Sequence, residues 1–216
     1  MIVTIDGPAG SGKSSAAKAL AARLGFEFLD TGAMYRAVAY AALRDRIQPQ
    51  DSAQFREWLI QLHIEATPGV LRLAGEDVIP FIRTPEITAL ASQLAAIAPV
   101  RTLLVDLQRR AAEGRNLVCE GRDQGTVVFP NAERKFFLIA NPVERARRRH
   151  RELHSRGQHL TLEEVLAAQD ERDRRDSERA VSPTRPAPDA TILDSTILSP
   201  EEVVARMESE VRRCAS

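Results

Sequence analysis

Short apolar segments alternate with longer amphipathic segments along most of the chain. In the first amphipathic segment, small or apolar residues recur at the spacing of a helix face, at positions 16, 17, 20, 21 and 24. Strands that alternate with helices build parallel sheets. The pattern therefore predicts an α/β fold in which helices flank a five-stranded, mostly parallel sheet. The predicted strands are residues 1–6, 26–29, 116–120, 135–139 and 190–193.

Helix-start signals mark three further helices in the second half of the chain. Asn141-Pro142 gives a cap followed by a proline in the first turn, and the helix is predicted to run through Arg156. Thr161 begins a T-x-x-E capping box, and Ser199-Pro200 repeats the order of cap and proline.

Residues 63–79 interrupt this alternation. Short apolar runs at 63–66, 70–73 and 77–79 are separated by turn signals, which predicts a small antiparallel sheet. Helices are expected next, at about 85–97 and 99–112. We therefore predict a core, an inserted lobe and a mobile lid. The core comprises residues 1–30, 106–144 and 161–216, the lobe 31–105 with its insert at 63–79, and the lid 145–160.

Composition limits the partners. The formal net charge is zero, so no overall field attracts nucleic acid or an anionic membrane, and we expect neither as a partner. The two cysteines suggest no disulfide framework, and no apolar run approaches the ~20 residues of a membrane span. No leader segment precedes the first predicted strand. We expect a cytoplasmic protein, monomeric, with small-molecule substrates.

A phosphate-binding motif follows the first predicted strand directly. Residues 7–14 read GPAGSGKS, which fits the P-loop pattern G-x-x-x-x-G-K-[ST]. A strand leading into a glycine-rich turn and then a helix presents backbone N–H groups and a positive dipole to an anion. Lys13 is expected to reach the β- and γ-phosphates of a nucleotide, and the Ser14 hydroxyl to ligate Mg²⁺. An accidental glycine-rich turn is the alternative.

Charged motifs follow two other predicted strands. Residues 30–36, DTGAMYR, end the second strand, and residues 120–123, EGRD, end the third. Ligands bind beyond the carboxyl ends of parallel strands, so both segments are expected beside the P-loop. Asp30 or Thr31 as a simple helix cap, and a structural salt bridge within residues 120–123, are the alternatives.

Arginine dominates the basic residues: 27 of the 30 are arginine, and many fall in two clusters. Such clusters suit a transferring phosphoryl group, whose oxygens need cations, although two solvated helix faces with acidic partners are the plainer interpretation. The clusters are Arg145, Arg147, Arg148, Arg149 and Arg151, and Arg172, Arg174, Arg175 and Arg179, the second interspersed with Asp170, Glu171, Asp173 and Asp176.

Several catalytic patterns are missing from the sequence. There is no Asn-Lys-x-Asp guanine motif, no Ser-His-Asp order and no HExxH. A phosphate acceptor needs no general base, because its second pKa is near 6 and it is largely a dianion at pH 7. Positioning and charge neutralisation then suffice. The missing motifs favour phosphoryl transfer to a small phosphorylated acceptor.

Taken together, these motifs resemble those of bacterial cytidylate kinases, within the nucleoside monophosphate kinases, over essentially the whole chain. The resemblance rests on GPAGSGKSS, LDTGAMYRAVAYAAL, TPEITALASQLAAIAPVR, EGRDQGTVVFP and ERDRRDSERAVSP, in that order. It implies transfer of the ATP γ-phosphoryl group to CMP or dCMP with Mg²⁺. The chain departs from the usual family pattern at Glu120 (usually Asp), Gln124 (usually Met) and Thr31 (usually Ser).

The resemblance also implies a role for each site residue. The ATP-binding residues would be Gly7, Pro8, Ala9, Gly10, Ser11, Gly12, Lys13, Ser14 and Ser15. The acceptor phosphate would lie against Thr31, Tyr35, Arg36, Arg122 and Arg179. The cytosine would contact Ser92, Arg101 and Asp123, and the ribose Arg172 and Asp176. The catalytic cations would be Lys13, Arg122 and Arg179, with Arg148 and Arg149 of the lid closing over ATP.

Two other interpretations remain. One is a related small-molecule kinase with UMP, AMP or a sugar acid as acceptor. The other is a nucleotide-dependent RNA-binding or regulatory module that uses the arginine clusters.

Overall fold

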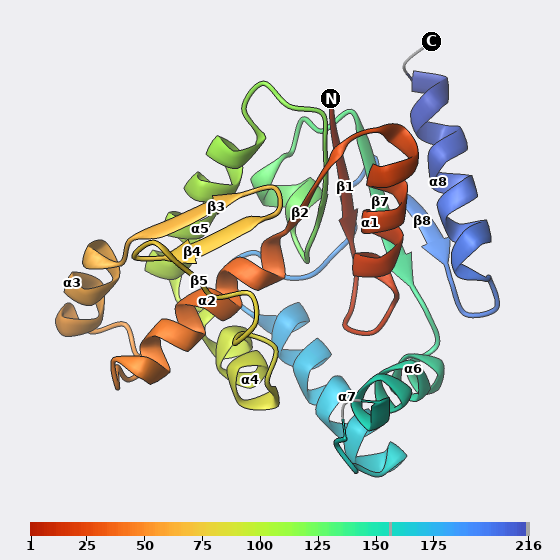
Figure 1. The fold of residues 1–216 in the computed structure, drawn as a ribbon. Coiled ribbons are helices and arrows are strands. Elements are labelled where there is room, and N and C mark those ends of the chain that lie inside the picture. Colours follow the sequence, from red (N-terminus) through yellow and green to blue (C-terminus); the bar gives the residue numbers. More distant parts are fainter. Residues whose placement is uncertain (156, 215–216) are drawn as a thin grey trace.

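The computed structural model describes residues 1–155 and 157–214, and its centre is a five-stranded parallel sheet (Figure 1). The strand order is β2-β6-β1-β7-β8, and every pairing in this sheet is parallel. The predicted sheet is confirmed, with strand ends displaced by one or two residues. The strands are β1 (Ile2–Asp6), β2 (Glu27–Asp30), β6 (Leu117–Glu120), β7 (Arg134–Ile139) and β8 (Thr191–Asp194).

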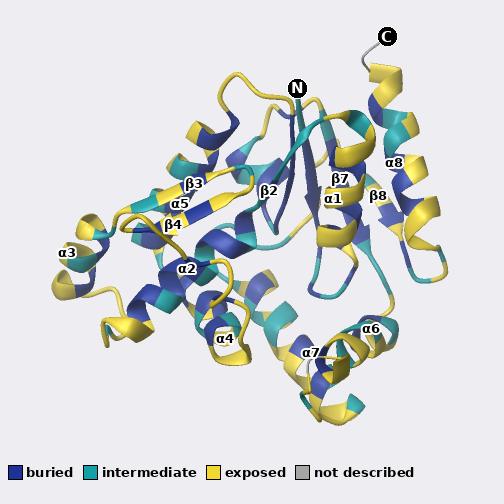
Figure 2. Cartoon of the chain, in the orientation of Figure 1, coloured by how far each residue is buried: buried dark blue, intermediate teal, exposed yellow. Residues whose placement is uncertain are grey.

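Helices cover both faces of the sheet, so its central strands are buried (Figure 2). Successive side chains of a strand point to opposite faces. On β6, Val118 accordingly packs with α1 (Lys13–Leu24) and α8 (Pro200–Cys214), whereas Leu117 and Cys119 pack with α2 (Thr31–Arg44) and α5 (Ala98–Ala112). Burial on both faces explains why these strands read as continuous apolar runs.

The inserted segment carries the predicted antiparallel sheet, in the order β3-β4-β5. Its strands are β3 (Ile64–Thr67), β4 (Val70–Leu73) and β5 (Glu76–Asp77), next to α3 (Ala53–Gln61). α3 has no counterpart among the predicted elements, although Ser52 caps it by accepting from the Phe55 N–H. The predicted strand at 77–79 was too long at its carboxyl end, because β5 ends at Asp77, whose side chain accepts from the Ile79 N–H at 3.0 Å in a local turn.

The apolar stretch after residue 84 forms two helices that meet at a sharp bend. α4 (Pro85–Leu94) ends earlier than predicted, and α5 begins at Ala98 with Pro99 in its first turn. The two axes differ by 100°. No single helix of the described residues is long and apolar enough to cross a membrane, and this bent pair meets that test only by its combined length and composition.

α6 (Pro142–Ser155) and α7 (Leu162–Glu178) form a helical hairpin below the sheet (Figure 1). Ala146, Leu153 and Val165 form a small apolar cluster between them. The predicted capping box at the start of α7 is present, because Thr161 and Glu164 each accept from the other's backbone N–H. α6 was predicted to reach Arg156, which lies outside the described residues.

Candidate active site

The glycine-rich turn joins β1 to α1 in the predicted P-loop arrangement. Gly7 has φ +142°, and a Cβ there would lie 2.1 Å from the Leu138 carbonyl oxygen, so only glycine fits. Gly12 is left-handed and gives α1 no side-chain cap, and no acidic residue lies in the first turn. The first N–H groups of α1 are therefore available to an anion. Lys13 donates from Nζ to the Pro8 carbonyl at 2.6 Å, across the loop.

A partly buried ion pair that was not assigned to the site braces this loop. Arg145 on α6 donates to the Ala9 carbonyl at 2.9 Å and pairs with Asp173 on α7, whose other carboxylate oxygen accepts from the Ala9 N–H at 3.1 Å. Both residues were placed only within charged helix clusters. The spacing along each helix does not show that they face each other across the hairpin, so the sequence held no signal for this brace.

The ends of β2 and β6 lie against the P-loop helix. Ser14 donates from Oγ to Glu120 Oε1 at 2.9 Å, and Thr31 donates from Oγ1 to the Glu120 carbonyl at 2.6 Å. Among the described residues, no group of three or more His, Cys, Asp or Glu could hold a metal ion. The adjacent hydroxyl and carboxylate oxygens of Ser14 and Glu120 are nonetheless hard donors of the kind that Mg²⁺ binds together with substrate phosphates.

Three arginines surround one carboxylate beyond the end of β6. Arg122 donates from Nε to Asp176 at 3.1 Å, and Arg172 lies 3.8 Å from the same carboxylate. Burial opposes ionisation of Asp176, but the charges of Arg122, Arg172 and Arg179 outweigh it and lower its pKa. Arg179 donates to the Ser182 carbonyl, while its buried Nη2 has no partner among the described residues. These three arginines form a cation cluster in which the unpartnered Nη2 of Arg179 can donate to an anionic ligand.

Lys13 lies in the same positive field. Burial, with the charge of Arg122 as the next cause, lowers the pKa of Lys13 to about 7. Burial and the Arg122 charge likewise lower the pKa of Arg172 to about 10. Ionisable groups with strongly shifted pKa values that lie close together are typical of a functional site. The phosphates of a ligand would relieve this mutual repulsion.

A second buried polar group adjoins the first. Arg101 on α5 forms an ion pair with Asp123, and its guanidinium lies 5.9 Å from the centre of the Tyr35 ring. Burial raises the pKa of Tyr35 to about 12. Ser92 on α4 is also buried, and its Oγ has no hydrogen-bond partner among the described residues. Arg101, Asp123 and Tyr35 thus form a buried polar group, and Ser92 adds a buried hydroxyl on the neighbouring helix α4.

Asp30 links the start of α2 to the lobe. It caps α2 by accepting from the Ala33 N–H at 2.8 Å, as the plainer interpretation predicted. Its Oδ2 also accepts from Arg36 Nη2 at 3.1 Å and from Arg83 Nη2 at 2.9 Å. The cap and the candidate phosphate-binding arginine therefore belong to one hydrogen-bonded group.

The two predicted lid arginines differ in their surroundings. Arg148 donates to the Ser195 carbonyl at 2.6 Å and lies close to the P-loop, because a Cβ on Gly12 would be 3.8 Å from its Nη1. Arg149 donates to Glu152 at 2.8 Å, three residues along the same helix. Only Arg148 of this pair adjoins the loop in the structure.

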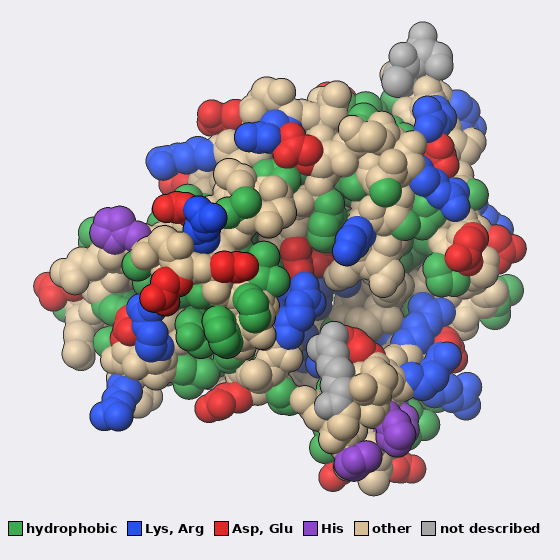
Figure 3. Space-filling view, in the orientation of Figure 1, with side chains coloured by type: hydrophobic (Ala, Val, Ile, Leu, Met, Phe, Trp, Pro, Cys, Tyr) green, Lys and Arg blue, Asp and Glu red, His purple; other side chains and the backbone are tan. Residues whose placement is uncertain are grey.

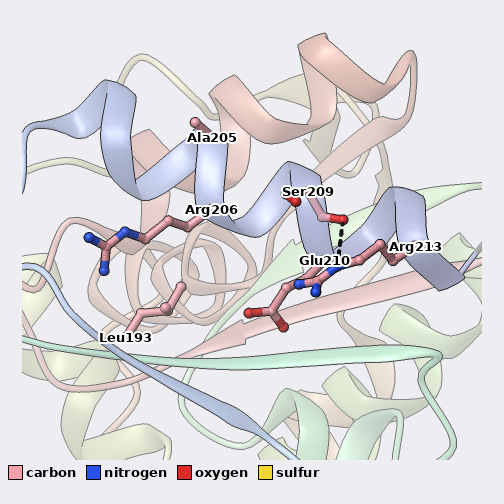
Figure 4. A pocket seen from close by; sticks show the side chains of 6 residues that line it. All are labelled: Leu193, Ala205, Arg206, Ser209, Glu210 and Arg213. Atoms are coloured by element: carbon pink, nitrogen blue, oxygen red, sulfur yellow. Dashed lines mark hydrogen bonds between the residues drawn. The ribbon is translucent and has the colours of Figure 1, made fainter.

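Figure 3 shows basic side chains on both sides of the hollow between α2 and the α6–α7 hairpin. A separate concavity lies between β8 and α8 (Figure 4). Its lining includes none of the predicted site residues, and Arg213 there donates back to the Ser209 carbonyl of its own helix. The candidate chemistry therefore lies at the carboxyl ends of β1, β2 and β6.

A P-loop on a parallel sheet, beside strand ends rich in cations, defines the class of P-loop kinases. The solved structure titled shikimate kinase from Bacteroides thetaiotaomicron shares this fold, with a TM-score of 0.50, 15% identity and 98% of both chains covered. At that identity the likeness concerns the fold alone. The sequence comparison is more specific, because residues 3–213 match the family described as Cytidylate kinase. The chain belongs to the cytidylate kinase family, and it is a kinase.

Curated proteins that are similar in sequence to this chain are cytidylate kinases, in agreement with the family match. A cytidylate kinase of Geobacter sulfurreducens is 50% identical over 216 residues, which cover 98% of this chain and 93% of the relative. One from Solibacter usitatus is 49% identical, covering 94% and 88%. A bifunctional pantoate ligase/cytidylate kinase of Synechococcus is 47% identical over 94% of this chain but only 39% of its own length.

Proposed function

We propose that this protein transfers the γ-phosphoryl group of ATP to CMP or dCMP, giving ADP and CDP or dCDP. One observation carries the proposal. Four successive residues, 120–123, join three parts of the site: Glu120 contacts the P-loop through Ser14, Arg122 binds the carboxylate of the cation cluster, and Asp123 pairs in the buried polar group. A donor phosphate, an acceptor phosphate and a base can therefore lie along one strand end.

The donor side is the P-loop. Residues 7–15 hold the ATP phosphates through backbone N–H groups, Lys13 lies at the β- and γ-phosphates, and Ser14 holds Mg²⁺. Bound with ATP, Mg²⁺ supplies charge neutralisation at the phosphate oxygens. The hydrogen bond between Ser14 and Glu120 supports this placement, because the Glu120 carboxylate would lie beside an ion held by Ser14.

The acceptor side is the cation cluster and the buried polar group. Thr31, Tyr35, Arg36, Arg122 and Arg179 hold the phosphate of CMP. Arg172 and Asp176 lie at the ribose, and Ser92, Arg101 and Asp123 bind the cytosine. A carboxylate can accept from the exocyclic amine of cytosine, which uracil lacks, and losing such a buried match costs several powers of ten in kcat/KM. Strong discrimination against UMP follows.

The acceptor phosphate needs no general base in this scheme, because it is already largely ionised at neutral pH. Alignment of the two phosphates and arginine charge then lower the barrier. We place the acceptor-binding lobe at residues 31–105 and the lid at 145–160. Closure of the lid would bring Arg148, and Arg149 after a change of partner, over the ATP phosphates and exclude water.

The test is coupled ADP release with ATP and Mg²⁺ against CMP, dCMP, UMP, AMP, GMP and no acceptor. Turnover confined to CMP and dCMP is expected. Turnover with UMP or AMP instead would leave a kinase but overturn the assignment of Ser92, Arg101 and Asp123. ATP binding without turnover on any acceptor would overturn the proposed reaction, and salt-dependent retention of RNA would then favour a regulatory module.

A further inference from the structure

Asp6 ends β1, immediately before the P-loop, and has no role in the scheme above. Its side chain is buried, and its carboxylate accepts two hydrogen bonds from backbone N–H groups of the segment that follows β6. Oδ1 accepts from the Gln124 N–H at 2.9 Å, and Oδ2 accepts from the Gly125 N–H at 2.8 Å. One carboxylate of the donor-side strand thus holds two consecutive amides of the acceptor-side loop.

Those amides begin η1 (Gln124–Val128), a short π-helical turn. The residue before a helix normally caps it with its own side chain. Here that residue is Asp123, which makes no capping hydrogen bond and pairs instead with Arg101. Asp6 accepts from the first two amides of η1, including that of Gly125, which an N-cap side chain usually binds, so the Asp123 carboxylate can face the proposed base site.

The start of η1 also packs closely against β1 and β7. A Cβ at Gly125 would lie 3.0 Å from Thr4 Oγ1 and 3.2 Å from Lys135 Cδ, so the fit leaves no room for a larger residue without displacement. Close packing and two hydrogen bonds therefore fix the start of η1 relative to β1. Since Gly7 follows Asp6 directly, the same contacts fix Asp123 relative to the P-loop.

We infer that Asp6 is a positioning residue that caps η1 from another strand and so sets the distance between the donor and acceptor sites. Its charge is costly, since burial raises the pKa of Asp6 to about 7 even though both amides oppose the shift. Asparagine would avoid that charge, but it would turn an amide donor toward one of the two N–H groups. A carboxylate is the side chain of this size that accepts from both. The inference rests on the proposed function for its substrates.

The test compares Asp6→Asn with Asp51→Asn, a matched change at an exposed carboxylate that pairs with Arg56 and belongs to none of the predicted site residues. Both are assayed with the acceptor that the wild-type enzyme uses best, so a wrong acceptor assignment does not affect the comparison. For Asp6→Asn we expect kcat/KM for the acceptor to fall on the order of 10²-fold, since small misplacements have effects of that size. Affinity for a non-hydrolysable ATP analogue should stay within about twofold in this scheme, because residues 7–15 still hold its phosphates. Asp51→Asn should match the wild type.

Two results would overturn the inference. One is unchanged kcat/KM and acceptor selectivity in Asp6→Asn, and the other is an equal loss of ATP-analogue and acceptor binding, which indicates a purely structural role. Hydrogen exchange on the wild-type protein gives an answer even where Asp6→Asn does not fold. The Gln124 and Gly125 amides should be protected like those of the central strands, and exchange at the rate of an exposed loop would contradict the cap.

Discussion

Replacing Asp123 with alanine tests whether the Arg101–Asp123 ion pair, at the proposed base site, is buried and coupled. In the wild-type protein both members of the Arg101–Asp123 pair are almost fully buried, at 4% and 3% exposure. The variant leaves the Arg101 guanidinium with one long hydrogen bond, to the Ala95 carbonyl at 3.4 Å. Removing one partner of a buried pair destabilises a protein by roughly 3–5 kcal/mol, because the other charge stays buried and uncompensated.

That magnitude is easily measured. For a domain of this length, 1 kcal/mol shifts the melting temperature by about 2–4 °C, so Asp123→Ala should melt about 6–20 °C below the wild type. Urea denaturation without nucleotide should show a lower midpoint with an unchanged slope. Adding Arg101→Met should recover most of the loss, since replacing both partners by apolar groups is often neutral.

An exposed pair supplies the control. Asp51 Oδ1 and Arg56 Nε lie 2.6 Å apart on the surface. Asp51→Ala should leave the midpoint of urea denaturation unchanged, because exposed pairs contribute little to stability. An Asp123→Ala protein within about 1 kcal/mol of the wild type would refute the reasoning, given the usual size of such losses. So would a double variant whose loss equals the sum of the two single losses, because the pair would then not be coupled.

Three further predictions concern the site. Arg36→Ala and Arg179→Ala should each lower kcat/KM for CMP by a few powers of ten and leave ATP-analogue affinity nearly intact; wild-type turnover would remove that residue from the phosphate site. Lys13→Ala should abolish turnover with every acceptor, since the charge at the β- and γ-phosphates is lost; residual rates near wild type would contradict it. Because the folded pKa of Asp6 is about 7 against an ordinary 3.8, the folded state holds an extra proton between those values. The unfolding free energy of the wild type relative to Asp6→Asn should thus fall as pH rises from about 4 to 7, by up to 1.36 kcal/mol per unit, and a flat difference in denaturation series would refute the shift.

The sheet and the P-loop were predictable because each depends on a local signal. An apolar run of four to six residues predicts a buried strand, and the spacing from Gly7 to Ser14 predicts the turn. The end of α4 was not predictable in the same way. The apolar pattern continues past Leu94 to Ile97, and no glycine or proline between Leu94 and Pro99 marks the bend in the sequence.

The same distinction between local and long-range signals applies to the residues of the candidate site. Residues within motifs, such as Lys13 and Arg122, could be named from the sequence. Asp6 and the Arg145–Asp173 brace could not, because their partners come from segments more than 100 residues away or from the facing helix of a hairpin. Charge patterns along one helix do not reveal which face meets a neighbour.

The position of β1 in the middle of the sheet determines when the enzyme can form during synthesis. Ile2 pairs with Leu117, and Val3 pairs with Arg134, so the first strand of the sheet to be translated waits for partners more than 100 residues further along the chain. A nascent chain that ends before residue 117 exposes an apolar strand with two open edges, the kind of species that aggregates or binds chaperones. Pairing over such separations is slow. The nucleotide site should therefore be absent from nascent chains until β7 has left the ribosome, so that ligand capture by stalled chains would report the completion of the sheet.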